Sequence, residues 1–115
     1  MSTNNNVAIA EAYYAAMVKN NIEEMGQYLD ADVQLISPFG KTVGKQAILE
    51  AARKSIPLSI TIRSKCTSGD QVMLAYDWQF NEPIGVLRAA ALMTFKDGLI
   101  VNNELFFDTR AFQQK

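Results

Sequence analysis

Near residue 56 the hydrophobic pattern of the chain switches to a period of two and keeps it, and this change constrains the fold more than any other feature. Before it, apart from one alternating stretch at residues 32–38, apolar residues recur every three or four positions, as on one face of a helix. After it, apolar and polar residues alternate, as in strands that bury one face. Helices gathered in the first half and strands in the second favour an α+β domain over a sheet in which strands and helices alternate.

Three helices are expected in the first half. The first is capped by Asn5 or Asn6 and runs to about Asn20, because Asn is a good helix cap and the Asn20-Asn21 pair interrupts the pattern. The second covers about residues 22–29, and the third covers about residues 45–54, after a glycine. The first two together form a helical hairpin.

Five strands are expected, and the last four follow one another as an antiparallel meander. The strongest turn signal is Asp97-Gly98, a pair typical of two-residue hairpins. Strict alternation places Lys65 on the face opposite to Ile62, and a bulge in the curved sheet would reverse such an assignment. The expected strands cover about residues 32–38, 56–65, 72–80, 86–95 and 100–107.

Composition excludes several classes of protein. The chain has 115 residues and a formal net charge of −1 without any basic cluster, so we expect one domain, residues 1–115, and no binding to nucleic acid. No apolar run is long enough to span a bilayer, and Cys66 is the single cysteine, so we expect a cytoplasmic protein without membrane contact. With no histidine and one cysteine, we expect neither a metal site nor a cofactor.

Three stretches resemble a known superfamily. The run from Tyr13 to Gly44, including Asn-Asn-Ile-Glu-Glu-Met and Ser-Pro-Phe-Gly, resembles the ketosteroid isomerases. The Phe95–Ile100 hairpin and the Leu105–Phe112 segment resemble the wider nuclear transport factor 2-like superfamily, including SnoaL-like cyclases and limonene epoxide hydrolases. The resemblance implies three helices packed in a strongly curved, mainly antiparallel sheet, which forms a cone (a cystatin-like fold) with an apolar pocket.

The catalytic residues of these relatives are mostly replaced. Aligned to the isomerases, Tyr13 matches the oxyanion tyrosine, but Ser37 replaces the base and Ala91 replaces the protonated aspartate. Aligned to limonene epoxide hydrolases, the three polar catalytic positions fall on Tyr76, Trp78 and Leu105. The catalytic residues of this chain, if it is an enzyme, are therefore unknown.

The same alignments indicate which side chains point into the cone. They form a mostly apolar and aromatic lining that suits a small hydrophobic ligand held by one or two hydrogen bonds. The alternative is that these side chains simply fill the core. The expected pocket residues are Tyr13, Met17, Ser37, Tyr76, Trp78, Asn103, Leu105 and Phe107.

The opposite sheet face is expected to carry Asp77, Arg88 and Glu104 around an apolar centre. The resemblance implies a homodimer through this convex face, because relatives commonly dimerise there. Three functions stay open. The first is a small-molecule binding domain, and the second is an isomerase, cyclase or dehydratase whose acid would be Asp77 or Glu104 if either faces inward. The third is a protein-interaction domain that uses the sheet face.

Overall fold

The structure is a computed structural model that describes residues 3–54 and 56–113. Within these residues the chain forms three α-helices, six strands and a short 3₁₀-helix. In chain order the elements are α1 (Thr3–Val18), α2 (Ile22–Gln27), β1 (Leu29–Ser37), β2 (Gly40–Val43), α3 (Lys45–Lys54), β3 (Ser59–Ser68), β4 (Gln71–Gln79), β5 (Val86–Lys96), β6 (Leu99–Phe107) and η1 (Thr109–Gln113).

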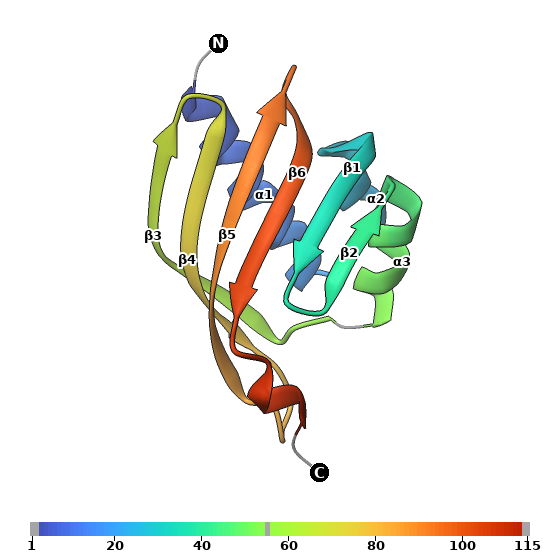
Figure 1. Ribbon diagram of the computed structural model, residues 1–115, viewed down its shortest axis with the longest axis vertical. Helices are drawn as coiled ribbons and strands as arrows, with labels where there is room; N and C mark the ends of the chain where they lie inside the picture. Colours follow the sequence, from blue (N-terminus) through green and yellow to red (C-terminus); the bar gives the residue numbers. More distant parts are fainter. Residues whose placement is uncertain (1–2, 55, 114–115) are drawn as a thin grey trace.

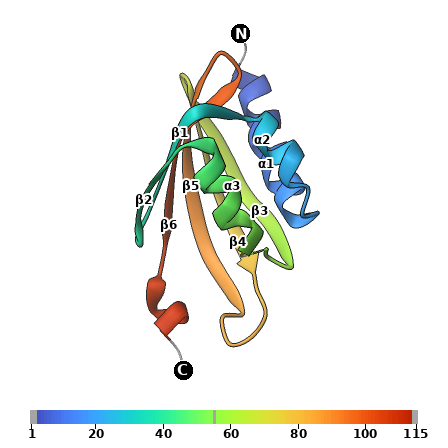
Figure 2. The same cartoon turned by 90° about the vertical axis from the view of Figure 1, so that its right-hand side faces the viewer.

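The strands form one sheet in the order β2-β1-β6-β5-β4-β3. Strands β3 to β6 are an antiparallel meander, and β1 runs parallel to β6. Figure 1 looks onto the sheet with α1 behind it, and Figure 2 shows the sheet curving around the helices. The predicted α+β fold, with three helices packed in a curved and mainly antiparallel sheet, is confirmed.

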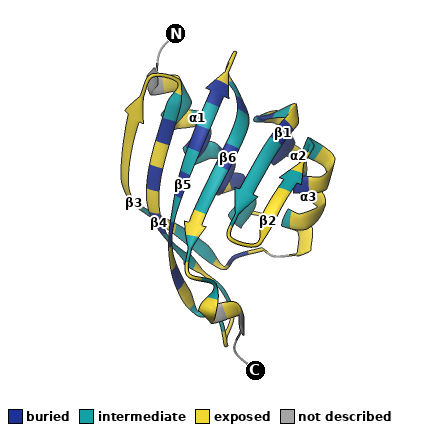
Figure 3. Ribbon diagram, in the orientation of Figure 1, coloured by how far each residue is buried: buried dark blue, intermediate teal, exposed yellow. Residues whose placement is uncertain are grey.

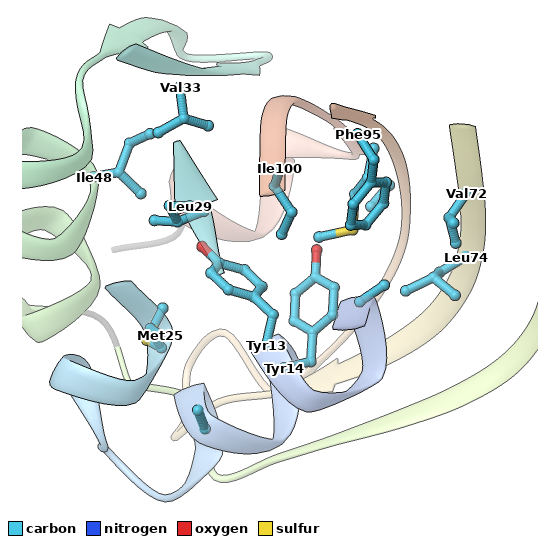
Figure 4. Close-up of a cluster of buried hydrophobic side chains, with 14 of the residues drawn as sticks. Tyr13, Tyr14, Met25, Leu29, Val33, Ile48, Val72, Leu74, Phe95 and Ile100 are labelled. Atoms are coloured by element: carbon cyan, nitrogen blue, oxygen red, sulfur yellow. The ribbon is translucent and has the colours of Figure 1, made fainter. Parts of the chain in front are cut away.

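The core lies between α1 and the concave face of the sheet. Tyr13 and Tyr14 are both buried, and both rings point from α1 toward the strands (Figure 4). Along β4 and β5 buried positions alternate with more exposed ones (Figure 3), as expected for strands with one covered face. Within the described residues, no helix is long and apolar enough to span a membrane.

Two helix boundaries differ from the sequence prediction. Helix α1 begins at Thr3, before the asparagines expected to cap it. Helix α2 ends at Gln27, and β1 already begins at Leu29, which was expected to be helical. The cause is long-range pairing, since the Ile100 N–H donates to the Tyr28 carbonyl at 2.8 Å and Leu29 pairs with Ile100.

Two short elements were not predicted. Strand β2 folds back on β1, with Ser37 opposite Gly40, and η1 follows the last strand. Both are too short to show a periodic pattern in the sequence. In addition, the strand expected from Ile56 begins only at Ser59, after Pro57, which has no N–H to donate to a sheet.

A bulge in β3 corrects the predicted orientation of Lys65. The register shifts between Ile62 and Ser64, so that Lys65 lies opposite Leu74, a fully buried residue of β4. Lys65 therefore lies on the helix-bearing face, where it forms an ion pair with Glu11 of α1. Further register shifts in β1 and between β5 and β6 accompany the curvature of the sheet.

Candidate functional site: the cone cavity

A cavity of about 150 Å³, which we call the cone cavity, lies between α1, α3 and the sheet. Helix α3 contributes two alanines, whose small side chains leave room, while the strands and α1 contribute larger side chains. The lining residues are Tyr13, Tyr14, Met17, Leu35, Ala51, Ala52, Trp78, Asn103 and Leu105. This lining is mainly apolar and aromatic, as is usual for small-molecule sites.

Most of the residues predicted to line the pocket meet at this cavity, and three do not. Ser37 ends β1, where its Oγ accepts a hydrogen bond from the Phe39 N–H at 3.1 Å and so stabilises the turn to β2. Tyr76 is buried behind Tyr14 and is not part of the lining. Phe107 packs further along the sheet against Trp78, with ring centroids 6.0 Å apart.

Tyr14 was not predicted as a pocket residue. It follows Tyr13 directly, and it lies one helical step away from the residue that the isomerase resemblance selects. Its ring packs edge-on against Tyr13, at 5.3 Å between centroids. Tyr14 also lines a second hollow of about 360 Å³ between α1 and β3, so its side chain borders both spaces.

Three buried tyrosines lie at or beside the cavity, since Tyr13 and Tyr14 line it and Tyr76 packs against Tyr14. The hydroxyl groups of Tyr14 and Tyr76 are 3.3 Å apart and form a hydrogen bond. Burial raises the pKa of Tyr13, Tyr14 and Tyr76 well above the usual value, and repulsion from a neighbouring tyrosinate adds to the rise for all three. The three hydroxyl groups therefore keep their protons at neutral pH, and in the bond between Tyr14 and Tyr76 one hydroxyl donates while the other accepts.

Two polar atoms of the lining residues are buried without a hydrogen-bond partner. They are the indole Nε1 of Trp78 and the amide Oδ1 of Asn103. Asn103 is only 4% exposed and is the buried polar residue of the described core. A buried polar group without a partner costs about 1–3 kcal/mol, so these atoms are unusual in a well-packed structure.

Aromatic side chains continue from Trp78 toward the C-terminal end of the molecule. The Trp78 ring contacts Phe80 at 5.2 Å as well as Phe107. Phe112 of η1 packs against Phe107 at 5.7 Å, and Phe39 of the β1–β2 turn packs against Phe112 at 5.3 Å. One wall of the cavity is therefore supported from outside by a cluster of phenylalanines.

The carboxylates considered as possible acids lie elsewhere. Asp77 and Glu104 are on the convex face, since they alternate with Tyr76 and Asn103 along their strands. Asp77 lies opposite Arg88, as predicted, and forms an ion pair with Arg63 at 3.1 Å. The described lining of the cone cavity contains no carboxylate, and the described residues contain no cluster of three or more metal-binding side chains.

A curved sheet wrapped around helices, with an apolar cavity between them, defines the nuclear transport factor 2-like class of proteins. Residues 10–103 match the model of the SnoaL-like domain. Because the match covers most of the chain, the protein belongs to the SnoaL-like family. A comparison with curated proteins finds no match.

Solved structures of the same fold are similar over nearly the whole chain. A nuclear transport factor 2-like protein of unknown function from Cytophaga hutchinsonii superposes with a TM-score of 0.86 at 19% identity, covering 92% of each chain. Bal32a, from a soil-derived mobile gene cassette, has a TM-score of 0.86 at 15% identity and covers 95% of this chain and 94% of its own. TerC, crystallised with polyporic acid, has a TM-score of 0.81 at 22% identity, with 95% of each chain covered. At such low identities the likeness concerns the fold.

Proposed function

We propose that this chain is a binding domain that holds a small, mainly hydrophobic molecule in the cone cavity. The observation that supports this function is an apolar and aromatic cavity of about 150 Å³, two of whose lining residues each have a buried polar atom without a protein partner. Sites of this composition bind ligands by burying apolar surface and use a few polar groups to orient them. TerC, another protein of this fold, was co-crystallised with the organic compound polyporic acid.

We favour binding over catalysis. An isomerase, cyclase or dehydratase of this fold needs a carboxyl group with a raised pKa inside the cone. The described lining provides tyrosine hydroxyls, one amide and one indole but no acid. Ser37 could not replace a base, because its hydroxyl is used in the turn and the chain has no histidine to activate it.

A thermal-shift screen with small apolar compounds tests this function. A specific ligand at about 100 times its Kd adds about 2.7 kcal/mol to the free energy of unfolding. For a domain of this size this raises Tm by about 4 °C or more. Compounds the size of one or two rings should be screened first, because the cavity is smaller than the ~300–1,000 Å³ of typical pockets for larger ligands.

A cavity-filling variant and a matched control show where the ligand binds. Ala52→Leu places a larger side chain in the lining, whereas Ala47→Leu makes the same change at an exposed position of α3. We expect the shift in Tm to disappear in Ala52→Leu and to persist in Ala47→Leu. A ligand that stabilises both variants equally would exclude the cone cavity as its site.

We further propose that two copies associate through the convex face. This face is the sheet surface opposite to the helices, and Figure 1 looks onto it. Met73 and Phe106 are 45% and 48% exposed there, while Ala75, Ala90 and Leu92 lie between them in the register. An apolar centre edged by charges is typical of a subunit interface. The alternative is that this apolar patch binds a different protein. A cytoplasmic location of the chain stays a prediction from the sequence.

The oligomeric state of the purified chain tests this association. Sedimentation equilibrium should give the mass of a dimer for the unmodified chain and of a monomer for Phe106→Glu, because the glutamate would be buried in the interface without a partner. Leu58→Glu, at an apolar residue that is 53% exposed before β3, should remain dimeric. If the unmodified chain is a monomer, the proposed dimer is wrong, and the convex face would then be tested as a binding site for a different protein.

A further inference from the structure

The two unpartnered atoms of the cone cavity have complementary chemistry. The Nε1 of Trp78 carries a hydrogen and only donates, and the Oδ1 of Asn103 only accepts. The two residues come from β4 and β6, with β5 between them, and both line the same cavity. A ligand that satisfies both must therefore offer an acceptor and a donor at the same time.

The volume of the cavity limits the ligand to about one ring. An apolar cavity of about 150 Å³ in another protein accommodates benzene, which sets the scale for the space seen here. The rings of Tyr13 and Tyr14 lie edge to face along the lining, and aromatic ligands gain from such arrangements beyond the burial of area. Size and lining together favour a single aromatic ring.

The charge of the lining selects the polar group on that ring. The described lining residues include no cation, so a carboxylate or phosphate would be buried without a counter-ion. The lining includes no anion either, which disfavours an amine in its charged form. A carbonyl or ether accepts from Trp78 but offers no hydrogen to Asn103. A neutral hydroxyl is the smallest group that does both.

We infer that the ligand of the cone cavity is a monocyclic phenol. Its ring occupies the apolar space, and its hydroxyl group accepts a hydrogen bond from the Trp78 indole and donates one to the Asn103 amide oxygen. This inference rests on the proposed function, because it names the ligand class of the same cavity. It differs from that function in predicting that the polar group, rather than apolar area alone, decides which ring binds.

Phenol, anisole and toluene form a matched series for testing this inference. If apolar burial alone decides, toluene and anisole bind at least as tightly as phenol, because they are less well hydrated in water. If the two polar atoms recognise the ligand, phenol binds about tenfold more tightly than toluene, and anisole, which only accepts, lies between them. Kd values come from titrations followed by NMR.

The same titrations report directly on one of the two hydrogen bonds. Trp78 is the only tryptophan of the chain, so its indole N–H gives a single, assignable signal. Phenol should move the indole proton downfield, as expected when an N–H gains an acceptor. Toluene has no acceptor atom, so it should not cause this downfield shift of the indole proton.

Neighbouring asparagines in β6 provide a variant and its control. Asn103→Leu removes the acceptor among the lining residues. Asn102→Leu makes the same change at the preceding residue, which points to the convex face of the sheet. The preference for phenol over toluene should be lost in Asn103→Leu and kept in Asn102→Leu. If Asn103→Leu does not fold, the phenol, anisole and toluene series and the indole signal of the unmodified chain still test the phenol inference.

The outcomes separate this inference from the proposed function. Equal or tighter binding of toluene without a downfield indole shift overturns the phenol inference and leaves a site for hydrophobic ligands. Binding of a larger compound from the thermal-shift panel, with none of the three rings binding, also overturns it and leaves the proposed function standing. If no compound in the panel stabilises the chain, the proposed function fails and the inference fails with it.

Discussion

The hydroxyl oxygens of Tyr14 in α1 and Tyr76 in β4 lie 3.3 Å apart in the buried core, so one hydrogen bond joins the long helix to the second strand from one edge of the sheet. The two rings also pack together, with centroids 5.1 Å apart. The side chain of Asn103 also interacts with the Tyr14 hydroxyl and lowers the pKa of Tyr14, against the larger rise caused by burial. This contact therefore couples the position of α1 to the polar end of the cone cavity.

Removing either hydroxyl should destabilise the chain, and removing both should cost less than the sum. Tyr14→Phe and Tyr76→Phe each leave a buried partner hydroxyl, and we expect each to lower the free energy of unfolding by about 1–2 kcal/mol. In the double variant neither hydroxyl is left alone, so the coupling energy should be at least about 0.5 kcal/mol. Urea unfolding of the four proteins measures this cycle, and strictly additive effects would show that the hydroxyl groups do not interact.

The buried tyrosines also predict how stability depends on pH. Burial raises the pKa of Tyr13, Tyr14 and Tyr76 in the folded chain, whereas unfolded tyrosine ionises at about pH 10. Below that pH both states keep the protons, and the contribution to stability is complete. Above it the unfolded state releases protons that the folded state retains, so the free energy of unfolding falls by up to about 1.4 kcal/mol per pH unit for each tyrosine.

Unfolding experiments between about pH 8 and pH 11.5 measure this slope. Because lysines also ionise in this range, Tyr76→Phe serves as the control, and its slope should be shallower than that of the unmodified chain. The ultraviolet absorbance of tyrosinate gives a second measurement, in which the buried tyrosines ionise only as the protein unfolds. If all the tyrosines ionise at a pH at which the protein is still folded, Tyr13, Tyr14 and Tyr76 are not buried as described.

Core and surface leucines should respond very differently to truncation. Leu74 of β4 is fully buried, and Leu74→Ala should cost about 2–5 kcal/mol through lost burial and the space left behind. Leu58 is 53% exposed, and Leu58→Ala should change stability by less than about 0.5 kcal/mol. Similar losses at both positions, measured by urea unfolding, would mean that the assigned core is wrong.

The fold was predictable because its main signals are long and local. Ten or so alternating residues per strand and the Asp97-Gly98 turn indicate the meander, and Asp97 and Gly98 indeed have positive φ angles of 53° and 78°. The boundaries that failed depend on distant partners, as Leu29 joins the sheet only because Ile100 lies beside it. The bulge near Ile62, which moves Lys65 to the other face, leaves no mark in the alternation of the sequence.

The candidate site was predictable in outline, because alternation and the family resemblance place Trp78, Asn103 and Leu105 on the concave face. The residues that the helices contribute to the site were harder to predict. A helix turns by about 100° per residue, so Tyr13 and Tyr14 both face the interior, and pattern alone does not decide which of them borders a cavity. The unpartnered state of the Trp78 and Asn103 atoms depends on the packing of several strands and has no signal in the sequence.

Phe112 should control how quickly a ligand leaves the cone cavity. It packs against Phe80 and Phe107, the two rings that support Trp78 from outside. Since Phe112 is 37% exposed and lies in η1, near the end of the chain, Phe112→Ala should cost less than about 1 kcal/mol of stability. Loss of its ring should nevertheless let Trp78 move more freely and raise the dissociation rate of a bound ligand by about threefold or more.

Relaxation-dispersion NMR on the indole signal of Trp78 measures this rate in the presence of a ligand found in the screen. Val43→Ala is a suitable control, because Val43 is 57% exposed and lies opposite Gln34, at the end of β2 away from the turn that carries Phe39. We expect faster dissociation in Phe112→Ala and an unchanged rate in Val43→Ala. Equal rates in all three proteins would mean that the ligand leaves by another route, and the hollow between α1 and β3, which Tyr14 separates from the cavity, would then be the next segment to test.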